Sequence, residues 1–166
     1  GYLANGQHIS FTNGIPSGTI YKDFWEYDAI NDSWAKVGTF DFLSDNIVNT
    51  SSIFVINQKA YLVSASGLWV FDPSDYSLTQ KASPPENVPF CISFAIADKG
   101  YYGIGEKGPF DFSKSFYEYN PSSDTWLKKA DFPGLHRRLA AGFSISGNGY
   151  VTCGETTKDI SPGTVQ

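Results

Sequence analysis

One short basic segment is a candidate for ligand chemistry. His136, Arg137 and Arg138 are consecutive and come directly before a predicted strand. Guanidinium groups bind carboxylates and sulfates through paired hydrogen bonds, so the segment indicates a cationic site for a carboxylate, a sulfate or a sugar acid. The main alternative is structural, with Arg137 bracing loops and backbone carbonyls.

Two glutamates are candidates to accompany this segment. Glu106 and Glu155 each follow a small residue at corresponding places in two repeats. Beside an arginine, such a carboxylate serves as a general acid or base, or as a structural partner of a backbone N–H or of Arg137. His8 is the other of the chain's 2 histidines and completes the predicted ligand-binding set.

The cysteines predict neither a metal site nor a redox site. Cys91 and Cys153 are the only 2 cysteines, and they lack the close spacing of a metal knuckle or a disulfide framework. We expect both to be small buried hydrophobes on inner strands. The sequence also lacks phosphate-loop, HExxH and GxSxG motifs. No cofactor or metal is therefore predicted.

An aromatic repeat organises the elements that must position these residues. Tyr27, Phe71 and Tyr119 each end an aromatic-x-aromatic segment, and they lie 44 and 48 positions apart. In the first and third copies a tryptophan follows, at Trp34 and Trp126. A period of this length with short strands is typical of four-stranded propeller blades.

A second signature predicts two more strands in each unit. Apolar runs lead through tight polar turns into segments that begin with tyrosine. The runs span residues 53–56, 92–96 and 141–145, and the tyrosines are Tyr61, Tyr101 and Tyr150. Asn, Asp and Gly in the turns tolerate positive φ and favour β-hairpins. Each unit is therefore predicted to hold an inner apolar strand, a tyrosine strand, an aromatic strand and an outer strand.

These features resemble the kelch-repeat β-propeller family. The resemblance rests on Tyr150-Val-Thr-Cys-Gly-Glu155, Tyr117-Glu-Tyr-Asn-Pro-Ser-Ser-Asp-Thr-Trp126 and Lys129-Ala-Asp-Phe-Pro-Gly134 followed by Arg137, and it covers nearly the whole chain. The sequence of the repeats is similar to that of kelch-like proteins from Bacteroidetes-type bacteria. The family's Gly-Gly doublet is reduced to pairs such as Cys153-Gly154, and Leu78 replaces the tryptophan in one copy. The resemblance implies an all-β fold of four-stranded antiparallel blades.

The strand count predicts an incomplete ring. The chain supplies thirteen strands, about three and a quarter blades, because its first and last units are partial. We expect one propeller segment over 1–166, with units at approximately 1–40 (partial), 53–84, 91–133 and 140–166 (partial). Kelch-like rings usually close with six or seven blades. The chain is therefore part of a larger propeller, completes a ring by association with itself or another chain, or closes as a small four-bladed ring.

Charge and hydropathy exclude some partners. The net charge is −5, and the 12 Lys and Arg residues form no basic patch, so nucleic acid is not expected as a partner. No apolar run is long enough to span a membrane.

Four long segments are expected to form loops on one propeller face, where a binding site would lie. They are Gln7–Thr19, Gly38–Ser52, Glu106–Ser115 and Asp131–Ala140. The first functional hypothesis is a non-catalytic module that binds a protein or glycan partner through this face, in a secreted, periplasmic or cell-surface setting.

The alternative is a sugar-modifying enzyme of the sialic-acid-epimerase or oxidase type, as the resemblance implies. It would use Arg137, Glu155 and His136 at the propeller channel. This alternative requires the three groups to converge within hydrogen-bond distance.

Overall fold

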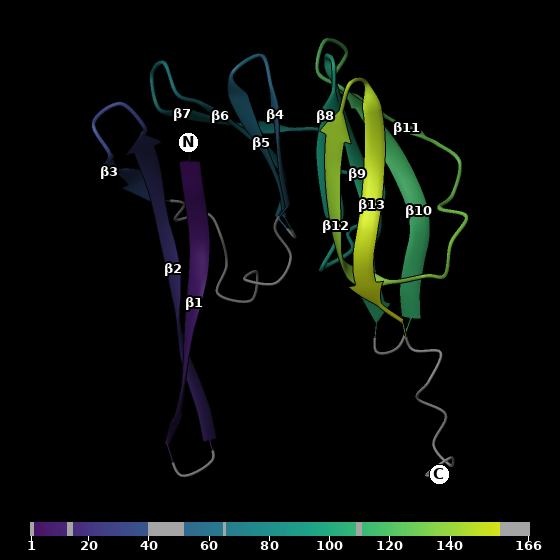
Figure 1. Cartoon of the computed structure of the whole chain (residues 1–166), viewed down its shortest axis with the longest axis horizontal. Helices are drawn as coiled ribbons and strands as arrows, with labels where there is room; N and C mark the ends of the chain where they lie inside the picture. Colours follow the sequence, from purple (N-terminus) through teal and green to yellow (C-terminus); the bar gives the residue numbers. More distant parts are fainter. Residues whose placement is uncertain (1, 13–14, 40–51, 65, 109–110, 157–166) are drawn as a thin grey trace. The chain divides into compact units, whose positions relative to one another are not determined.

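Thirteen β-strands and no helix make up the described part of the chain. The computed structural model describes residues 2–12, 15–39, 52–64, 66–108 and 111–156, with side chains described from residue 21 onward. The strands form antiparallel sheets of three, four, four and two strands (Figure 1). The predicted all-β class and strand count are confirmed. No helix capable of crossing a membrane occurs among these residues.

Residues Gly1–Asn49 form one compact unit, with three strands in chain order. These are β1 (Tyr2–Thr12), β2 (Ile15–Asp28) and β3 (Ser33–Thr39). β1 pairs with β2 as far as Thr12 and Ile15, so Gln7–Thr19 is not the predicted loop but a long hairpin arm. The sequence explains this: polar and apolar residues alternate there up to an Asn-Gly pair, a strong hairpin signal.

Residues Thr50–Gln166 form the second unit, with three sheets. The first sheet holds β4 (Ser52–Ile56), β5 (Lys59–Ser64), β6 (Gly67–Asp72) and β7 (Ser77–Lys81). The next holds β8 (Ile92–Ile96), β9 (Lys99–Gly108), β10 (Asp111–Asn120) and β11 (Thr125–Lys128). The last holds β12 (Arg138–Ile145) and β13 (Asn148–Glu155).

A second predicted loop, Glu106–Ser115, is also a hairpin arm. Glu106 pairs with Phe112 and Gly108 with Asp111, so β9 and β10 stay paired up to these residues. Gly38–Ser52 falls mostly outside the described residues. Of the three predicted loops that the structure mostly describes, Asp131–Ala140 alone is largely free of strand, because β12 begins at Arg138.

Adjacent sheets of the second unit pack through a repeated contact between a ring and a glycine. Phe54 on β4 stacks on Tyr61 with ring centroids 5.1 Å apart, and Gly100 of the next sheet lies against the Phe54 ring. Phe94 on β8 stacks on Tyr101 at 5.6 Å, and Gly149 covers it in the same way. A Cβ on either glycine would overlap the ring, so only glycine permits this approach.

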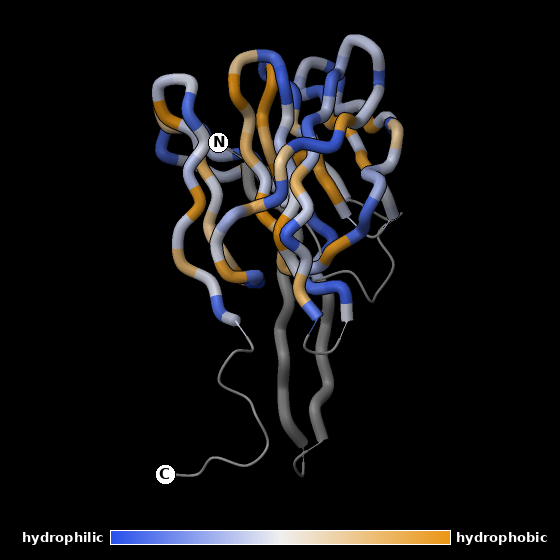
Figure 2. Tube along the Cα trace, turned by 90° about the vertical axis from the view of Figure 1, so that its right-hand side faces the viewer, coloured by the Kyte–Doolittle hydropathy of each residue, from blue (hydrophilic) through white to orange (hydrophobic). Residues whose placement is uncertain are grey.

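The burial of the stacked phenylalanine decreases from the first sheet of the second unit to the last. Phe54 is 3% exposed, whereas Phe143, the corresponding residue on β12, is 42% exposed although it stacks on Tyr150 at 5.4 Å. Apolar stretches run along the strands, and hydrophilic residues mark several turns (Figure 2). Among the described residues, the side of the last sheet that faces away from β8 therefore lacks the cover that its two predecessors have.

The outer hairpins share one backbone feature. Asp32, Tyr76 and Asp124 occupy corresponding turn positions and have φ values of 47°, 57° and 53°.

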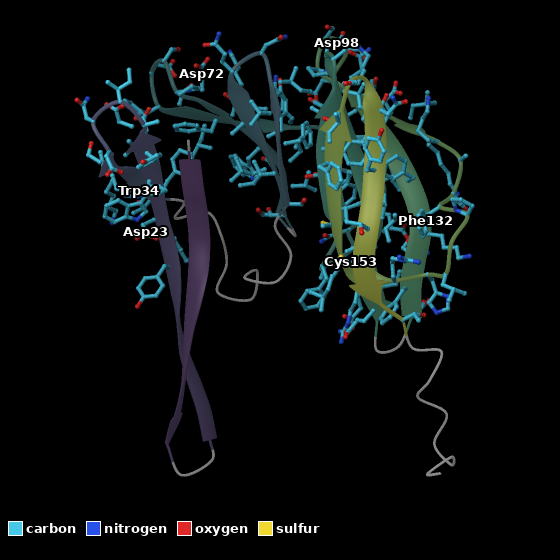
Figure 3. All side chains as sticks on the ribbon, in the orientation of Figure 1. Asp23, Trp34, Asp72, Asp98, Phe132 and Cys153 are labelled. Carbon is cyan, nitrogen blue, oxygen red and sulfur yellow. The ribbon has the colours of Figure 1, made fainter. Side chains whose placement is uncertain are left out.

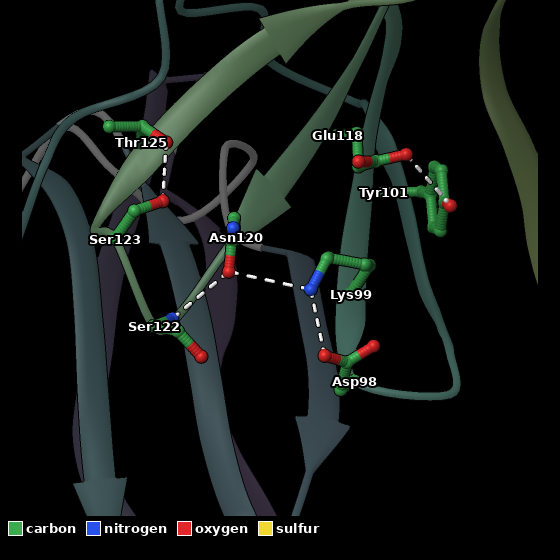
Figure 4. A network of polar contacts seen from close by, with 8 residues as sticks. All are labelled: Asp98, Lys99, Tyr101, Glu118, Asn120, Ser122, Ser123 and Thr125. Atoms are coloured by element: carbon green, nitrogen blue, oxygen red, sulfur yellow. Dashed lines mark hydrogen bonds and ion pairs between the residues drawn. The ribbon is translucent and has the colours of Figure 1, made fainter.

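A polar network links the inner turn of the β8–β11 sheet to its outer turn. Lys99 bonds both the Asp98 carboxylate at 2.7 Å and the Asn120 side chain at 3.4 Å (Figure 4).

Glu86 fastens the segment between β7 and β8 to the β9–β10 hairpin. Its carboxylate accepts from Lys107 at 2.6 Å, from Ser113 at 3.0 Å and from Tyr117 at 3.5 Å. Burial works to raise the pKa of Glu86, but the bonds from Lys107 and the serine hydroxyls outweigh it and the pKa is lowered. The ionised form is therefore the one that stabilises the fold.

Glu86→Gln is expected to lower the free energy of unfolding by about 1 kcal/mol at neutral pH. Because the native pKa of Glu86 is lowered, its contribution is complete above the ordinary glutamate pKa of about 4.3 and is lost as pH falls through the native value. Denaturant unfolding as a function of pH measures the effect, with Asp111→Asn on the exposed start of β10 as the control. A difference that stays constant into acid would contradict the prediction.

Candidate functional site

Arg138, the first residue of β12, lies between two carboxylates from different strands. Its Nη1 donates to Glu106 Oε2 on β9 at 2.5 Å. Its Nε and Nη2 both bond Glu155 Oε1 at the end of β13, at 2.7 and 2.6 Å. The resulting Glu106–Arg138–Glu155 cluster joins the last two sheets, with the Arg138 side chain 32% exposed.

Aromatic rings support the guanidinium from the protein side. The guanidinium carbon of Arg138 lies 5.3 Å from the centroid of the Phe90 ring and 5.5 Å from that of Phe112. His136 meets the Phe112 ring edge-to-face with centroids 5.8 Å apart. A cation over aromatic faces is stabilised by their quadrupoles, so the rings help to fix the plane of the Arg138 head group.

Left-handed residues precede both glutamates of the cluster. Ile104 has φ 52° ahead of Gly105, and Cys153 has φ 59° ahead of Gly154. A Cβ at Gly105 would lie 2.6 Å from the Pro89 carbonyl oxygen, and one at Gly154 would lie 2.9 Å from that of Arg138. The small residue noted in the sequence is therefore required by close backbone approach.

Arg137 points to backbone instead of to a carboxylate. Its Nη1 donates to the Cys153 carbonyl at 2.9 Å and its Nε to the Leu135 carbonyl at 3.1 Å. Its guanidinium also lies 5.0 Å from the Phe132 ring centroid. Arg137 thus holds backbone carbonyls, as predicted for a structural arginine. Glu155 pairs with Arg138, the residue next to Arg137, and not with Arg137 itself.

The cluster has no excess of positive charge. The hydrogen bonds that Arg138 donates to Glu106 and then to Glu155 raise the pKa of Arg138, so its guanidinium stays charged. One guanidinium therefore lies between two carboxylates, while the neighbouring Arg137 bonds backbone carbonyls. The arrangement presents both hydrogen-bond donors and acceptors to solvent.

The other predicted residues lie apart from the cluster or outside the described side chains. His8 lies on β1 in the first unit, and its side chain is outside the described part. Cys91 is partly buried, and burial raises its pKa to about 12. Cys153 is exposed, not buried as predicted (Figure 3), because it lies on β13 of the two-stranded last sheet, where most residues are exposed, whereas Ile104 at the corresponding position of β9 is buried. The described residues contain no cluster of three or more metal-binding side chains.

Comparison with known proteins supports the fold. No protein-family model matches the chain, and no curated protein matches it. Among solved structures, the structure of YjhT is similar, with a TM-score of 0.69 and 15% sequence identity. The match covers 88% of this chain and 53% of that one, so the chain spans about half the length of YjhT. The fold is thus all-β, with four-stranded antiparallel sheets consistent with part of a kelch-like propeller.

Proposed function

We propose that this chain is a non-catalytic recognition module that binds a neutral glycan at the Glu106–Arg138–Glu155 cluster. The observation that carries the proposal is the arginine held between two carboxylates above two phenylalanine rings. Sugar hydroxyls both donate and accept hydrogen bonds, so they match a surface that offers carboxylate oxygens and guanidinium N–H groups side by side.

The cluster keeps unused hydrogen-bonding capacity for such a ligand. Nη1 and Nη2 of Arg138 each carry a second N–H that the bonds to the two glutamates do not use. Glu155 is 54% exposed and lies at the outer side of the cluster. A sugar ring over this edge would meet polar groups already fixed in position, which lowers the entropic cost of binding. A secreted, periplasmic or cell-surface setting is part of this proposal.

Glycan-array screening followed by calorimetric titration tests the proposal. We expect neutral oligosaccharides to bind, and Arg138→Gln to weaken binding by about tenfold or more, as loss of a charged hydrogen bond does. Lys129→Gln is the matched control, because it removes a positive charge that pairs with Glu118 at 3.2 Å outside the cluster. Circular dichroism establishes that both variants fold.

Two results would reject the proposal: no neutral glycan binds, or binding survives Arg138→Gln unchanged. The sugar-modifying alternative has its own signature, because NMR of the mixture would then show chemical change in the bound sugar. The positions of Arg137 and Glu155 do not favour that alternative, because Arg137 bonds backbone carbonyls and Glu155 bonds Arg138.

A further inference from the structure

The last sheet of the second unit ends in a strand that is paired on one side. β5 and β9 hold the corresponding place in their sheets and are paired on both sides, β5 with β4 and β6, and β9 with β8 and β10. Among the described strands, β13 pairs with β12 alone. Its other edge offers a row of backbone donors and acceptors that an added strand can use.

An apolar groove of about 340 Å³ lies beside β13. The residues that line it include members of the β8–β11 sheet and of β13, namely Phe94, Tyr101, Phe116, Gly149 and Val151. Tyr101 and Phe116 are half-buried there. Their counterparts one repeat earlier, Tyr61 and Leu68, are buried. The groove therefore marks an interface between sheets that the described residues fill only in part.

One sheet earlier, the outer hairpin β10–β11 fills the equivalent place. Tyr117 and Tyr119 of β10 belong to the buried core that β9 and β10 share with the β4–β7 sheet, and the rings of Tyr119 and Tyr61 are 5.9 Å apart between centroids. Trp126 of β11 packs against the same core. The last sheet has described counterparts of β8 and β9 only, so the side chains that close this interface are the ones that the groove lacks.

The backbone that leaves the preceding sheet differs in the same way. The Ala82 amide donates to Asp124 Oδ1 at 2.9 Å, and Trp126 Nε1 donates to the Ala82 carbonyl at 2.7 Å, so the outer hairpin binds both polar groups of Ala82. Ala130 is the counterpart of Ala82 one repeat later, and each of the two follows a lysine. Ala130 lines the groove, and among the described residues its amide and carbonyl have no hydrogen-bond partner.

The outer hairpins of a second copy of this chain do not suit this edge. Their first strands are already paired on both sides, since β2 lies between β1 and β3, β6 between β5 and β7, and β10 between β9 and β11. None of these strands has a free edge to offer to β13. The occupant is therefore a hairpin whose aromatic strand has one unpaired edge.

We propose that β13 and the groove bind an aromatic β-hairpin of a partner protein by strand addition. The partner's first strand runs antiparallel to β13, as β10 runs to β9. Tyr119 stands opposite Gly100 on β9, and Tyr117 stands opposite the residue two positions later. The same register places aromatic residues of the partner opposite Gly149 and Val151, where they enter the groove.

The partner's second strand and turn complete the contact at Ala130. A tryptophan on that strand donates from its indole N–H to the Ala130 carbonyl, and an aspartate in the turn accepts from the Ala130 amide. This contact does not depend on glycan binding, because Glu155 lies at the other end of β13.

Titration calorimetry of the full chain with a synthetic peptide of residues 115–129, which contain the β10–β11 hairpin, tests the proposal. We expect saturable binding of one peptide per chain. A peptide with Tyr119→Ser and Trp126→Ser is expected to bind at least tenfold more weakly. Hydrogen exchange at amides of β13 is expected to slow when the first peptide binds, because strand addition pairs the free edge.

Ala130→Glu in the chain places a charged side chain in the groove and is expected to weaken peptide binding at least tenfold. Ala130 is exposed and lies outside the strands, so the variant should fold, and circular dichroism checks this. Gln80→Glu on β7 adds the same charge outside the groove lining and should bind like the unmodified chain. The proposal is overturned if the peptide does not bind, if Ala130→Glu leaves binding unchanged, or if exchange at β13 is the same with and without bound peptide.

Discussion

Gly103→Ala is expected to lower the free energy of unfolding of the second unit by about 3 kcal/mol, the upper range for overpacking a filled interior. A Cβ at Gly103 would lie 2.9 Å from the Phe116 Cα and closer still to the Ser115 carbonyl oxygen. Both obstacles are backbone atoms of β10, so no side-chain rotation relieves the overlap. The β9–β10 pairing would have to open at this register, where Gly103 faces Phe116.

Gly108→Ala supplies the matched control on the same strand. A Cβ there meets no atom of the described residues within 4 Å, and the substitution restricts the unfolded chain, so stability should stay level or rise slightly. Chemical denaturation of the two variants against the unmodified chain measures the contrast. Equal stability of the two variants would mean that β10 does not approach Gly103 as closely as described.

Asp124→Ala is expected to destabilise the second unit by about 3 kcal/mol, because it leaves two donors without their acceptor. The Tyr119 side chain is fully buried and donates to Asp124, and the Ala82 amide shares the same oxygen. Burial and the bond to Asp124 both raise the pKa of Tyr119, so the phenol stays protonated and its donor must be satisfied.

Hydrogen exchange at the Ala82 amide and denaturant unfolding together measure this effect. Asp32→Ala is the control, because Asp32 accepts a bond from Tyr27 at an exposed turn of the first unit, and its effect should stay within the small range usual for surface substitutions. If Asp124→Ala leaves the exchange rate of the Ala82 amide unchanged, Asp124 does not hold that amide in solution.

Most of the architecture is predictable from periodicity. The spacing of Tyr27, Phe71 and Tyr119 gives the unit length, and apolar runs followed by polar turns give the inner hairpins, so the strand count and order follow. The long arms of β1–β2 and β9–β10 were missed because their polar, glycine-containing segments suggested loops, although in β1–β2 the alternation up to an Asn-Gly pair is a hairpin signal. In β9–β10 a Gly-Pro pair weakens the strand signal, so composition did not reveal its pairing.

The candidate site was predicted in its residue types but not in its pairings. Glu106 and Glu155 do meet an arginine, but it is Arg138, whereas Arg137 turns to carbonyls. Adjacent residues at a strand's start face opposite ways, so an error of one position exchanges their roles. The bonds from Tyr27 to Asp32 and from Tyr119 to Asp124 were missed although their signal is present, because an Asp lies five positions after each tyrosine.

The contact between a ring and the next sheet's glycine sets an order for folding during synthesis. Phe54 is covered by Gly100, and Phe94 by Gly149, so each sheet emerging from the ribosome has an uncovered aromatic stack until the following repeat has been translated. A nascent chain paused between repeats would present that stack to the cytosol and to chaperones, as unfinished domains do. The Phe54 stack stays uncovered while residues 57–100 are translated. The rate of translation through these residues would therefore influence the yield of folded protein more than the rate through the outer turns of the last completed sheet.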